Sequence, residues 1–215
     1  MQSLIKRSSS SLLLFLLALT YPIISVGSSH LVWSMSFIAL IVLTACVALM
    51  QMQWHYQILA GIGLVAALLA SYGQWVLLPL LLAQIGLALI LSTQQLTDDV
   101  SVSGQLLIAG FMQVAVTMSQ SHVLTHTFLL DLAFQLLPFI LAAFARRLPS
   151  LMVAIGELVI IITAYATQRF TIITALVCIV LALLPLKRKQ AWWPAYWLAA
   201  ALIVGVALHL TMLHG

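Results

Sequence analysis

The sequence predicts an all-α, polytopic transmembrane helix bundle with about nine spans. Hydrophobic residues make up 64% of the chain and charged residues only 6%, whereas a soluble domain carries about a quarter charged residues. Residues 8–97 contain no Asp, Glu, Lys or Arg, and such a run holds several spans of roughly 20 residues each. The apolar runs are continuous rather than alternating, which favours helices over the strands of a barrel. The lipid bilayer is therefore the expected partner, and nucleic acid is excluded.

Polar clusters, Gly and Pro divide the chain into nine apolar segments, each about long enough to cross hydrocarbon. In order they cover residues 11–28, 31–50, 56–72, 75–92, 103–119, 128–145, 150–167, 170–186 and 192–212. The segment 103–119 is the weakest, because it is short and contains Gln105, Gln113 and Thr117. The connections leave no room for a soluble catalytic domain, so residues 1–215 are expected to form a single integral membrane domain.

The basic residues predict the orientation of these segments, because cytoplasmic loops of membrane proteins collect Lys and Arg. Nine spans with a cytoplasmic N-terminus leave only Arg169 on the external side. The cytoplasmic set is Lys6, Arg7, Arg146, Arg147, Lys187, Arg188 and Lys189. We therefore predict a multi-pass protein of a bacterial-type inner (plasma) membrane, with a periplasmic or external C-terminus. The first segment also imitates a secretory signal, so its cleavage stays an open alternative.

Glu157 is the first candidate for a functional residue. It lies about eight residues into its segment, which at 1.5 Å per residue is roughly 12 Å from the cytoplasmic edge and close to the midplane. Burial at that depth favours the neutral carboxyl, and a group that can gain and lose a proton there suits a proton-coupled carrier. The alternative is a protonated Glu that hydrogen-bonds a neighbouring helix and fixes packing.

Three glutamines are expected at a similar depth. Gln84, Gln113 and Gln135 each lie near the middle of one segment, so with Glu157 four consecutive segments carry one long polar side chain each near the middle of the membrane. These side chains can form one polar cluster that lines a substrate or proton path. The alternative is that each amide makes a structural hydrogen bond between helices.

Asp131 and Arg169 are expected at the same height near the external side, where an ion pair between them would explain why both are tolerated. Pro138 follows on the same segment as Asp131 and is expected to kink it or free a carbonyl.

His122 and His126 are weak candidates for a metal site. They are four residues apart and would share one helical face if the segment 128–145 began early, with Asp131 or His209 as a further ligand. The alternative is that neutral imidazoles lie in the membrane interface. We predict no metal and no other cofactor.

The motifs that would identify a phosphate-binding loop, a zinc protease or a serine hydrolase are missing, which favours a role without catalysis. The expected function is a small proton-responsive carrier, or a lipid-linked export component of the cell envelope, with Glu157 as its centre. One alternative is a non-catalytic subunit of a larger envelope complex, in which case other membrane subunits or a homo-oligomer are the partners. Another is an intramembrane enzyme with an external His/Asp site. The substrate is not predicted.

Overall fold

The computed structural model describes residues 2–27, 31–53, 55–94, 96–183 and 194–213. These residues form nine α-helices and two short 3₁₀ helices, η1 (Trp75–Leu77) and η2 (Phe144–Arg146), with no strand among them. The α-helices are α1 (Gln2–Val26), α2 (Met35–Met50), α3 (Tyr56–Ala70), α4 (Leu78–Thr93), α5 (Asp98–Ser121), α6 (His126–Ala143), α7 (Ser150–Ala166), α8 (Ile172–Leu183) and α9 (Pro194–Leu213). The predicted all-α class is confirmed.

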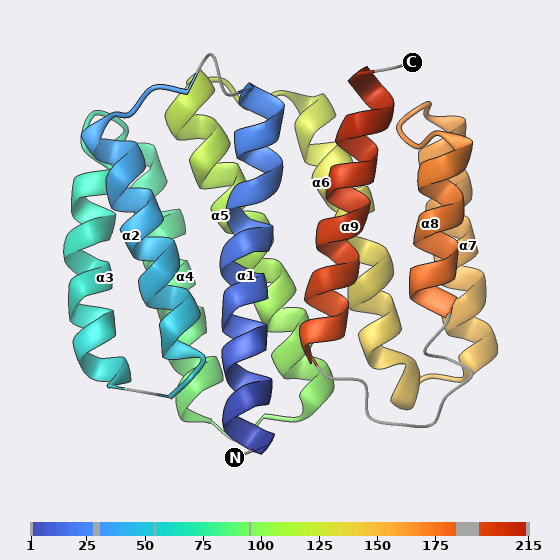
Figure 1. The fold of residues 1–215 in the computed structure, drawn as a ribbon, viewed down its shortest axis with the longest axis horizontal. Helices are drawn as coiled ribbons and strands as arrows, with labels where there is room; N and C mark the ends of the chain where they lie inside the picture. Colours follow the sequence, from blue (N-terminus) through green and yellow to red (C-terminus); the bar gives the residue numbers. More distant parts are fainter. Residues whose placement is uncertain (1, 28–30, 54, 95, 184–193, 214–215) are drawn as a thin grey trace.

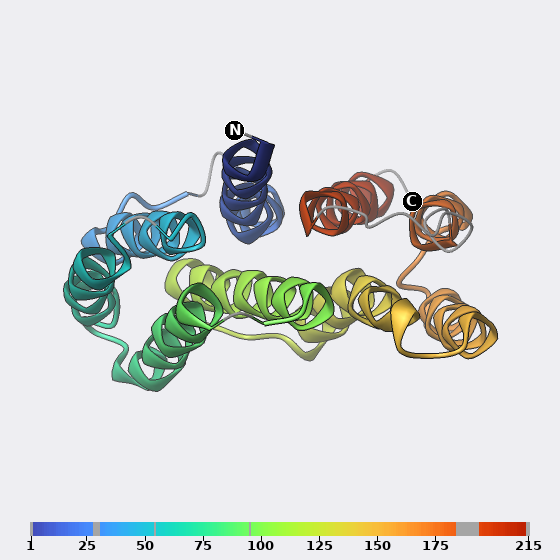
Figure 2. The ribbon, with the colours of Figure 1, turned by 90° about the horizontal axis from the view of Figure 1, so that it is seen from below.

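Consecutive helices run in opposite directions, so the start of α1 and the end of α9 lie at opposite ends of the bundle (Figure 1). We call these the N end and the C end. The first and last helices pack against each other, and both also contact α5. Figure 2 shows α1 and α9 side by side over α5 and α6, with α2, α3 and α4 on one flank and α7 and α8 on the other. The four helices α1, α5, α6 and α9 therefore form the centre of the protein.

Five of these helices are long and apolar enough to cross a membrane: α1, α4 with its 3₁₀ start, α5, α6 and α9. The other four, α2, α3, α7 and α8, are apolar but shorter, at 10–17 residues. By length and composition the chain is a membrane protein.

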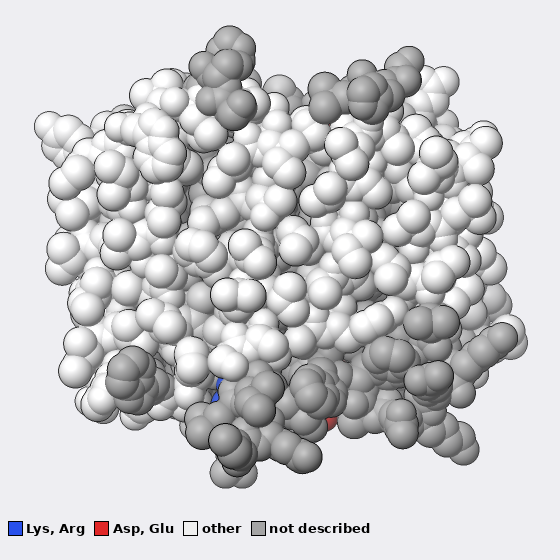
Figure 3. Space-filling view, viewed as in Figure 1, with Lys and Arg blue, Asp and Glu red and all other residues white. Residues whose placement is uncertain are grey.

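Helix α3 buries its small residues and exposes most of its large apolar ones. The residues that it buries are all small: Ala60, Gly63, Ala66, Ala67 and Ala70. Its large residues face outward instead: Ile58, Ile62, Leu64, Val65, Leu68 and Leu69. A helix in water does the opposite and buries its large apolar side chains. Small residues at helix contacts and large ones outside are typical of membrane helices, and almost every described atom on the face in Figure 3 is neither acidic nor basic.

The segment predicted most weakly, 103–119, is the long central helix α5, with 24 residues. It is the most buried of the five candidate spans. Gln105 and Gln113 make it look weak in the sequence, but both side chains point into the protein and not into lipid. A helix in the middle of a bundle can carry polar residues that a lipid-facing helix cannot.

Several boundaries differ from the prediction. Helix α1 begins at Gln2, well before residue 11, and carries the serine run. Helix α2 begins at Met35 and not at 31, because the Ser34 hydroxyl caps it by accepting a hydrogen bond from the Phe37 N–H at 3.2 Å. The predicted end of segment eight and the predicted start of segment nine fall in 184–193, outside the described residues, as do Lys187, Arg188 and Lys189.

Candidate functional site

Polar side chains, all of them buried except the partly exposed Arg169, follow the contacts of the central helices from one end of the bundle to the other. We call this set the polar seam and describe it at three levels. Its members are Ser10, Gln51 and Gln105 near the N end, Gln113 and Gln135 in the middle, and Tyr21, Asp131 and Arg169 near the C end.

The level near the N end is a chain of three hydrogen-bonding side chains. The Ser10 hydroxyl of α1 donates to Gln105 Oε1 of α5 at 2.9 Å. Gln105 Nε2 in turn donates to Gln51 Oε1, at the end of α2, over 3.5 Å. Ser10 and Gln105 are each 5% exposed and Gln51 is 9% exposed. Gln51 Nε2 has no hydrogen-bond partner among the described residues.

The middle level consists of two amides that bond to the backbones of other helices. Gln113 Nε2 donates to the Leu17 carbonyl of α1 at 2.8 Å. Gln135 Nε2 donates to the Ala201 carbonyl of α9 at 3.0 Å. Gly205, one turn further along α9, leaves the space that Gln135 occupies, because a Cβ there would collide with its amide. Both glutamines keep an amide oxygen without a hydrogen-bond partner in the described part of the chain.

The level near the C end is the predicted ion pair with an additional tyrosine. Arg169 Nη1 lies 3.7 Å from Asp131 Oδ1, so this pair is present as expected. Tyr21 of α1 interacts electrostatically with both groups. Its ring stacks on Phe128 of α6, with the ring centroids 5.8 Å apart. Helix α6 continues through Pro138, the residue expected to kink it.

The helix rise relates the three levels to one another. Gln105 and Gln113 are eight residues apart on α5, which corresponds to about 12 Å, and Asp131 and Gln135 are four residues apart on α6, or about 6 Å. The seam therefore extends over most of the length of the central helices.

Glu157 and Gln84 lie outside this seam. Glu157 is in the middle of α7, is 0% exposed, and interacts electrostatically with the Cys178 thiol of α8. Neither of its carboxyl oxygens has a hydrogen-bond partner among the described residues, and the same holds for both side-chain polar atoms of Gln84 on α4. Glu157 and the three glutamines thus do not form one hydrogen-bonded cluster. Segment position predicts the depth of a side chain, but which neighbour it faces depends on how each helix is rotated.

The condition under which His122 and His126 would share one helical face, an early start of the helix that contains Asp131, is not met for both residues. Helix α5 ends at Ser121, and His122 follows in the left-handed conformation with φ 55°, where it ends the helix. Helix α6 begins only at His126. The His122 ring contacts the Gln74 side chain. No group of three or more potential metal ligands (His, Cys, Asp or Glu) occurs among the residues that the structure describes.

A second ion pair, at the N end, was not predicted. Arg147 Nε lies 2.6 Å from Asp99 Oδ2, and Arg147 Nη2 donates to the Thr97 hydroxyl at 2.6 Å. These contacts tie the start of α5 to the connection before α7. The sequence signal for this pair is that Asp99 and Arg147 lie in or beside two connections that the nine-span arrangement places on the same side of the membrane.

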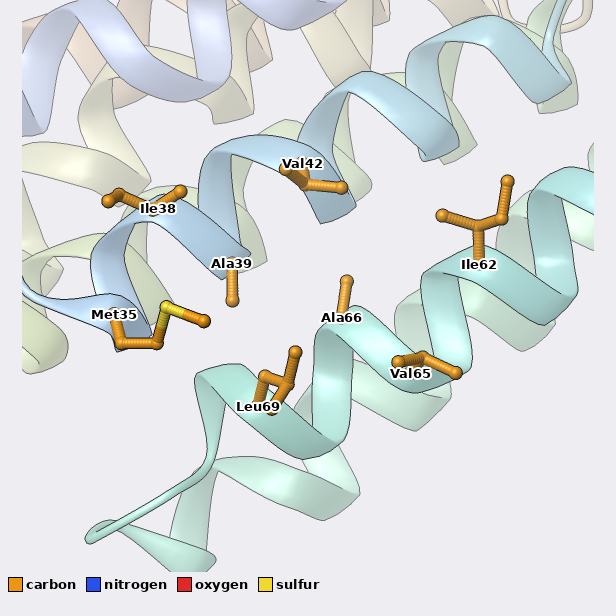
Figure 4. A pocket seen from close by; sticks show the side chains of 8 residues that line it. All are labelled: Met35, Ile38, Ala39, Val42, Ile62, Val65, Ala66 and Leu69. Atoms are coloured by element: carbon orange, nitrogen blue, oxygen red, sulfur yellow. The ribbon is translucent and has the colours of Figure 1, made fainter.

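The outer surface carries an apolar groove between α2 and α3, with a volume of about 320 Å³ (Figure 4). Its lining is Met35, Ile38, Ala39, Val42, Ile62, Val65, Ala66 and Leu69. The groove offers no group for chemistry, but it can accept apolar groups from lipid or from another helix.

The fold and its interior together define a helical membrane protein with a polar centre. No protein-family model, curated protein or solved structure matches the chain. Its function is therefore inferred from its own residues.

Proposed function

We propose that the protein is a small proton-responsive carrier, or a lipid-linked export component, of a bacterial-type inner (plasma) membrane. The observation that carries this proposal is Glu157, a fully buried carboxyl in the middle of α7 whose two oxygens have no hydrogen-bond partner among the described residues.

An unpaired carboxyl in a low-dielectric interior costs several kcal/mol, so such groups are retained mainly where they have a function. A glutamate that only fixes packing is expected to hydrogen-bond a neighbouring helix. The contacts of Glu157 do not support that alternative. A carboxyl that binds and releases a proton at this place would change the charge next to α6 and α8, the two helices that flank α7.

In this proposal the polar seam is the path. The amide oxygens of Gln113 and Gln135, which have no partner within the described ranges, can accept hydrogen bonds from a polar solute, and a few such groups in an apolar interior suffice for recognition. The Asp131–Arg169 pair lies at one end of the path, and Gln51 with Gln105 lies at the other. Helix α6 carries Gln135 and also contacts α7, so it connects the path to Glu157.

The proposal includes nine crossings with a cytoplasmic N end. The four shorter helices would then also cross, and the alternating direction of all nine described helices supports this (Figure 1). A bilayer can become thinner around short apolar helices at a cost of fractions of a kcal/mol per Å.

The protonation of Glu157 can be tested without knowing the substrate. We expect the reconstituted protein to show a carboxyl C=O infrared band that changes between acidic and alkaline pH and disappears in Glu157→Gln. Asp131→Asn and Asp99→Asn assign any contribution from the other two buried carboxyls among the described residues. Asp98→Asn makes the same chemical change at the N end and should leave the band intact. A band that is unchanged in Glu157→Gln would contradict the proposal.

The apolar groove between α2 and α3 favours a second candidate, a non-catalytic subunit of a larger envelope complex, because it can accept side chains of a partner helix. Such a subunit should lose stability without its partner. Purification as a stable, ligand-responsive monomer would count against this candidate.

A further inference from the structure

A polar pocket of about 290 Å³ lies at the C end of the bundle, where the start of α2, the end of α5 and the connection after α3 meet. Its volume is at the lower end of the range of small-molecule sites, about 300–1,000 Å³. The described lining consists of three serines, two glutamines and one each of His, Tyr, Gly and Val. None of these residues is Asp, Glu, Lys or Arg. The pocket therefore suits an uncharged ligand, because a charged group would find no counter-ion in this lining.

Two of the polar side chains hold the walls of the pocket together. Gln120 of α5 accepts a hydrogen bond from the Val32 N–H at 3.0 Å through Oε1 and donates to the Val32 carbonyl at 3.1 Å through Nε2. The Ser36 hydroxyl of α2 donates to the Ala70 carbonyl at the end of α3. These bonds connect segments that are far apart in the sequence, so the pocket is formed before a ligand binds.

Two serines keep hydrogen-bonding groups for a ligand. Ser119 Oγ lies 3.4 Å from Ser36 Oγ. Since Ser36 gives its only proton to the Ala70 carbonyl, Ser119 donates to Ser36 and keeps the lone pairs of its own oxygen. Ser34 Oγ accepts from the Phe37 N–H at 3.2 Å, which leaves its hydroxyl proton as a donor.

His122 and Tyr72 complete the set. Gln74 Nε2 contacts His122 Nδ1, and because an amide nitrogen only donates, Nδ1 accepts and the neutral ring carries its proton on Nε2. His122 is exposed, so this N–H is a second donor for a ligand. Tyr72 is 79% exposed and offers an aromatic face on which apolar C–H groups can pack.

We propose that this pocket binds an uncharged, hydroxyl-rich group of the size of a single sugar ring. Hydroxyl groups both donate and accept, so they match the donors of Ser34 and His122 and the lone pairs of Ser119. The C–H face of a sugar ring would pack against Tyr72. The site goes beyond the proposed carrier function and does not depend on it, because it requires no transport and no protonation of Glu157.

Two sources carry this chemistry: a free monosaccharide and the headgroup of a glycolipid. The apolar groove between α2 and α3 takes part of its lining from the same turn of α2 as the pocket. Met35, at one end of the groove in Figure 4, is the chain neighbour of Ser34 and Ser36, which line the pocket. Apolar surface next to the pocket suits the lipid, whose acyl chain can lie in the groove.

The test is lipid binding to the full chain, measured by native mass spectrometry. A polyoxyethylene ether serves as the detergent, because a glycoside detergent would itself compete for the pocket. Monoglucosyl diacylglycerol is offered against phosphatidylglycerol with the same acyl chains, which carries a negative charge and no sugar. We expect a preference for the glucosyl lipid.

Variants of the lining identify the site. Tyr72→Ala and His122→Asn should each weaken binding of the glucosyl lipid about two- to tenfold, the range for one lost aromatic contact or neutral hydrogen bond. Asn tolerates the left-handed conformation of His122. Tyr165→Ala is the matched control, because Tyr165 is also exposed and lies near the C end of α7, outside the pocket lining. It should leave the preference intact.

Adding free glucose distinguishes the two sources. Displacement of the lipid by excess glucose would show that the sugar alone is recognised, and no displacement would assign the site to the intact glycolipid. Equal binding of the two lipids by the unmodified protein would overturn the proposal. Equal effects of Tyr72→Ala and Tyr165→Ala would also overturn it.

Discussion

Arg169→Gln should lower the free energy of unfolding by about 2–3 kcal/mol, because it leaves the Asp131 carboxylate, 5% exposed, without its counter-ion. The pair is 3.7 Å apart and Arg169 is partly exposed, so the loss should be at the lower end of the values for buried pairs. Unfolding in detergent micelles with increasing denaturant measures it.

A double-mutant cycle also removes the charge of Asp131, which Arg169→Gln leaves without its counter-ion. Asp131→Asn in the Arg169→Gln background should restore most of the lost stability, since neither partner then carries a charge. Arg7→Gln is the matched control, because Arg7 is exposed and bonds a neutral amide; its effect should be below about 0.5 kcal/mol. Equal losses for Arg169→Gln and Arg7→Gln would show that the pair contributes nothing.

Gly205→Ala should lower stability by about 1–3 kcal/mol, the usual cost of forcing an extra methyl into a packed site. The new Cβ would collide with the amide of Gln135 and push it away from the Ala201 carbonyl. A buried amide in the middle of the bundle has few other partners, so the hydrogen bond would be lost as well.

Gly61→Ala is the control for this substitution. Gly61 lies on α3, and a Cβ there meets nothing within 4 Å, so the change should be neutral or stabilise the helix by up to about 1 kcal/mol. Combining Gly205→Ala with Gln135→Ala removes the colliding amide and should recover part of the loss. If Gly205→Ala and Gly61→Ala behave alike, the close packing of α6 and α9 at Gln135 is not as described.

The sequence predicts the helices well because each apolar segment is bounded by its own polar, Gly or Pro residues. Prediction from the sequence is least reliable for helices that are surrounded by other helices of the protein and not by lipid. Helix α5 looked marginal because of Gln105 and Gln113, yet those residues face other helices. A single sequence does not show whether a polar residue faces lipid or protein.

Only part of the candidate site could be predicted, because the sequence indicates the depth of a side chain but not which distant helix it contacts. The Asp131–Arg169 pair follows from two opposite charges at one depth. The bond from Ser10 to Gln105 connects residues 95 positions apart on helices that are not consecutive, and Tyr21 of α1 interacts electrostatically with Asp131 of α6. Depth can be counted along a segment, but the packing of distant helices depends on the shapes of all side chains between them.

The carrier proposal requires the polar seam to connect the two sides of the membrane, so α5 must cross it. The direct measurement is labelling with a membrane-impermeant maleimide, after the buried cysteines Cys46 and Cys178 have been replaced by alanine. Thr97 and Val123 flank α5 and are exposed. Val123→Cys should react in intact cells, and Thr97→Cys should react only after the membrane is opened. Reaction of both positions from one side, or the reverse pattern, would contradict the nine-crossing bundle with a cytoplasmic N end.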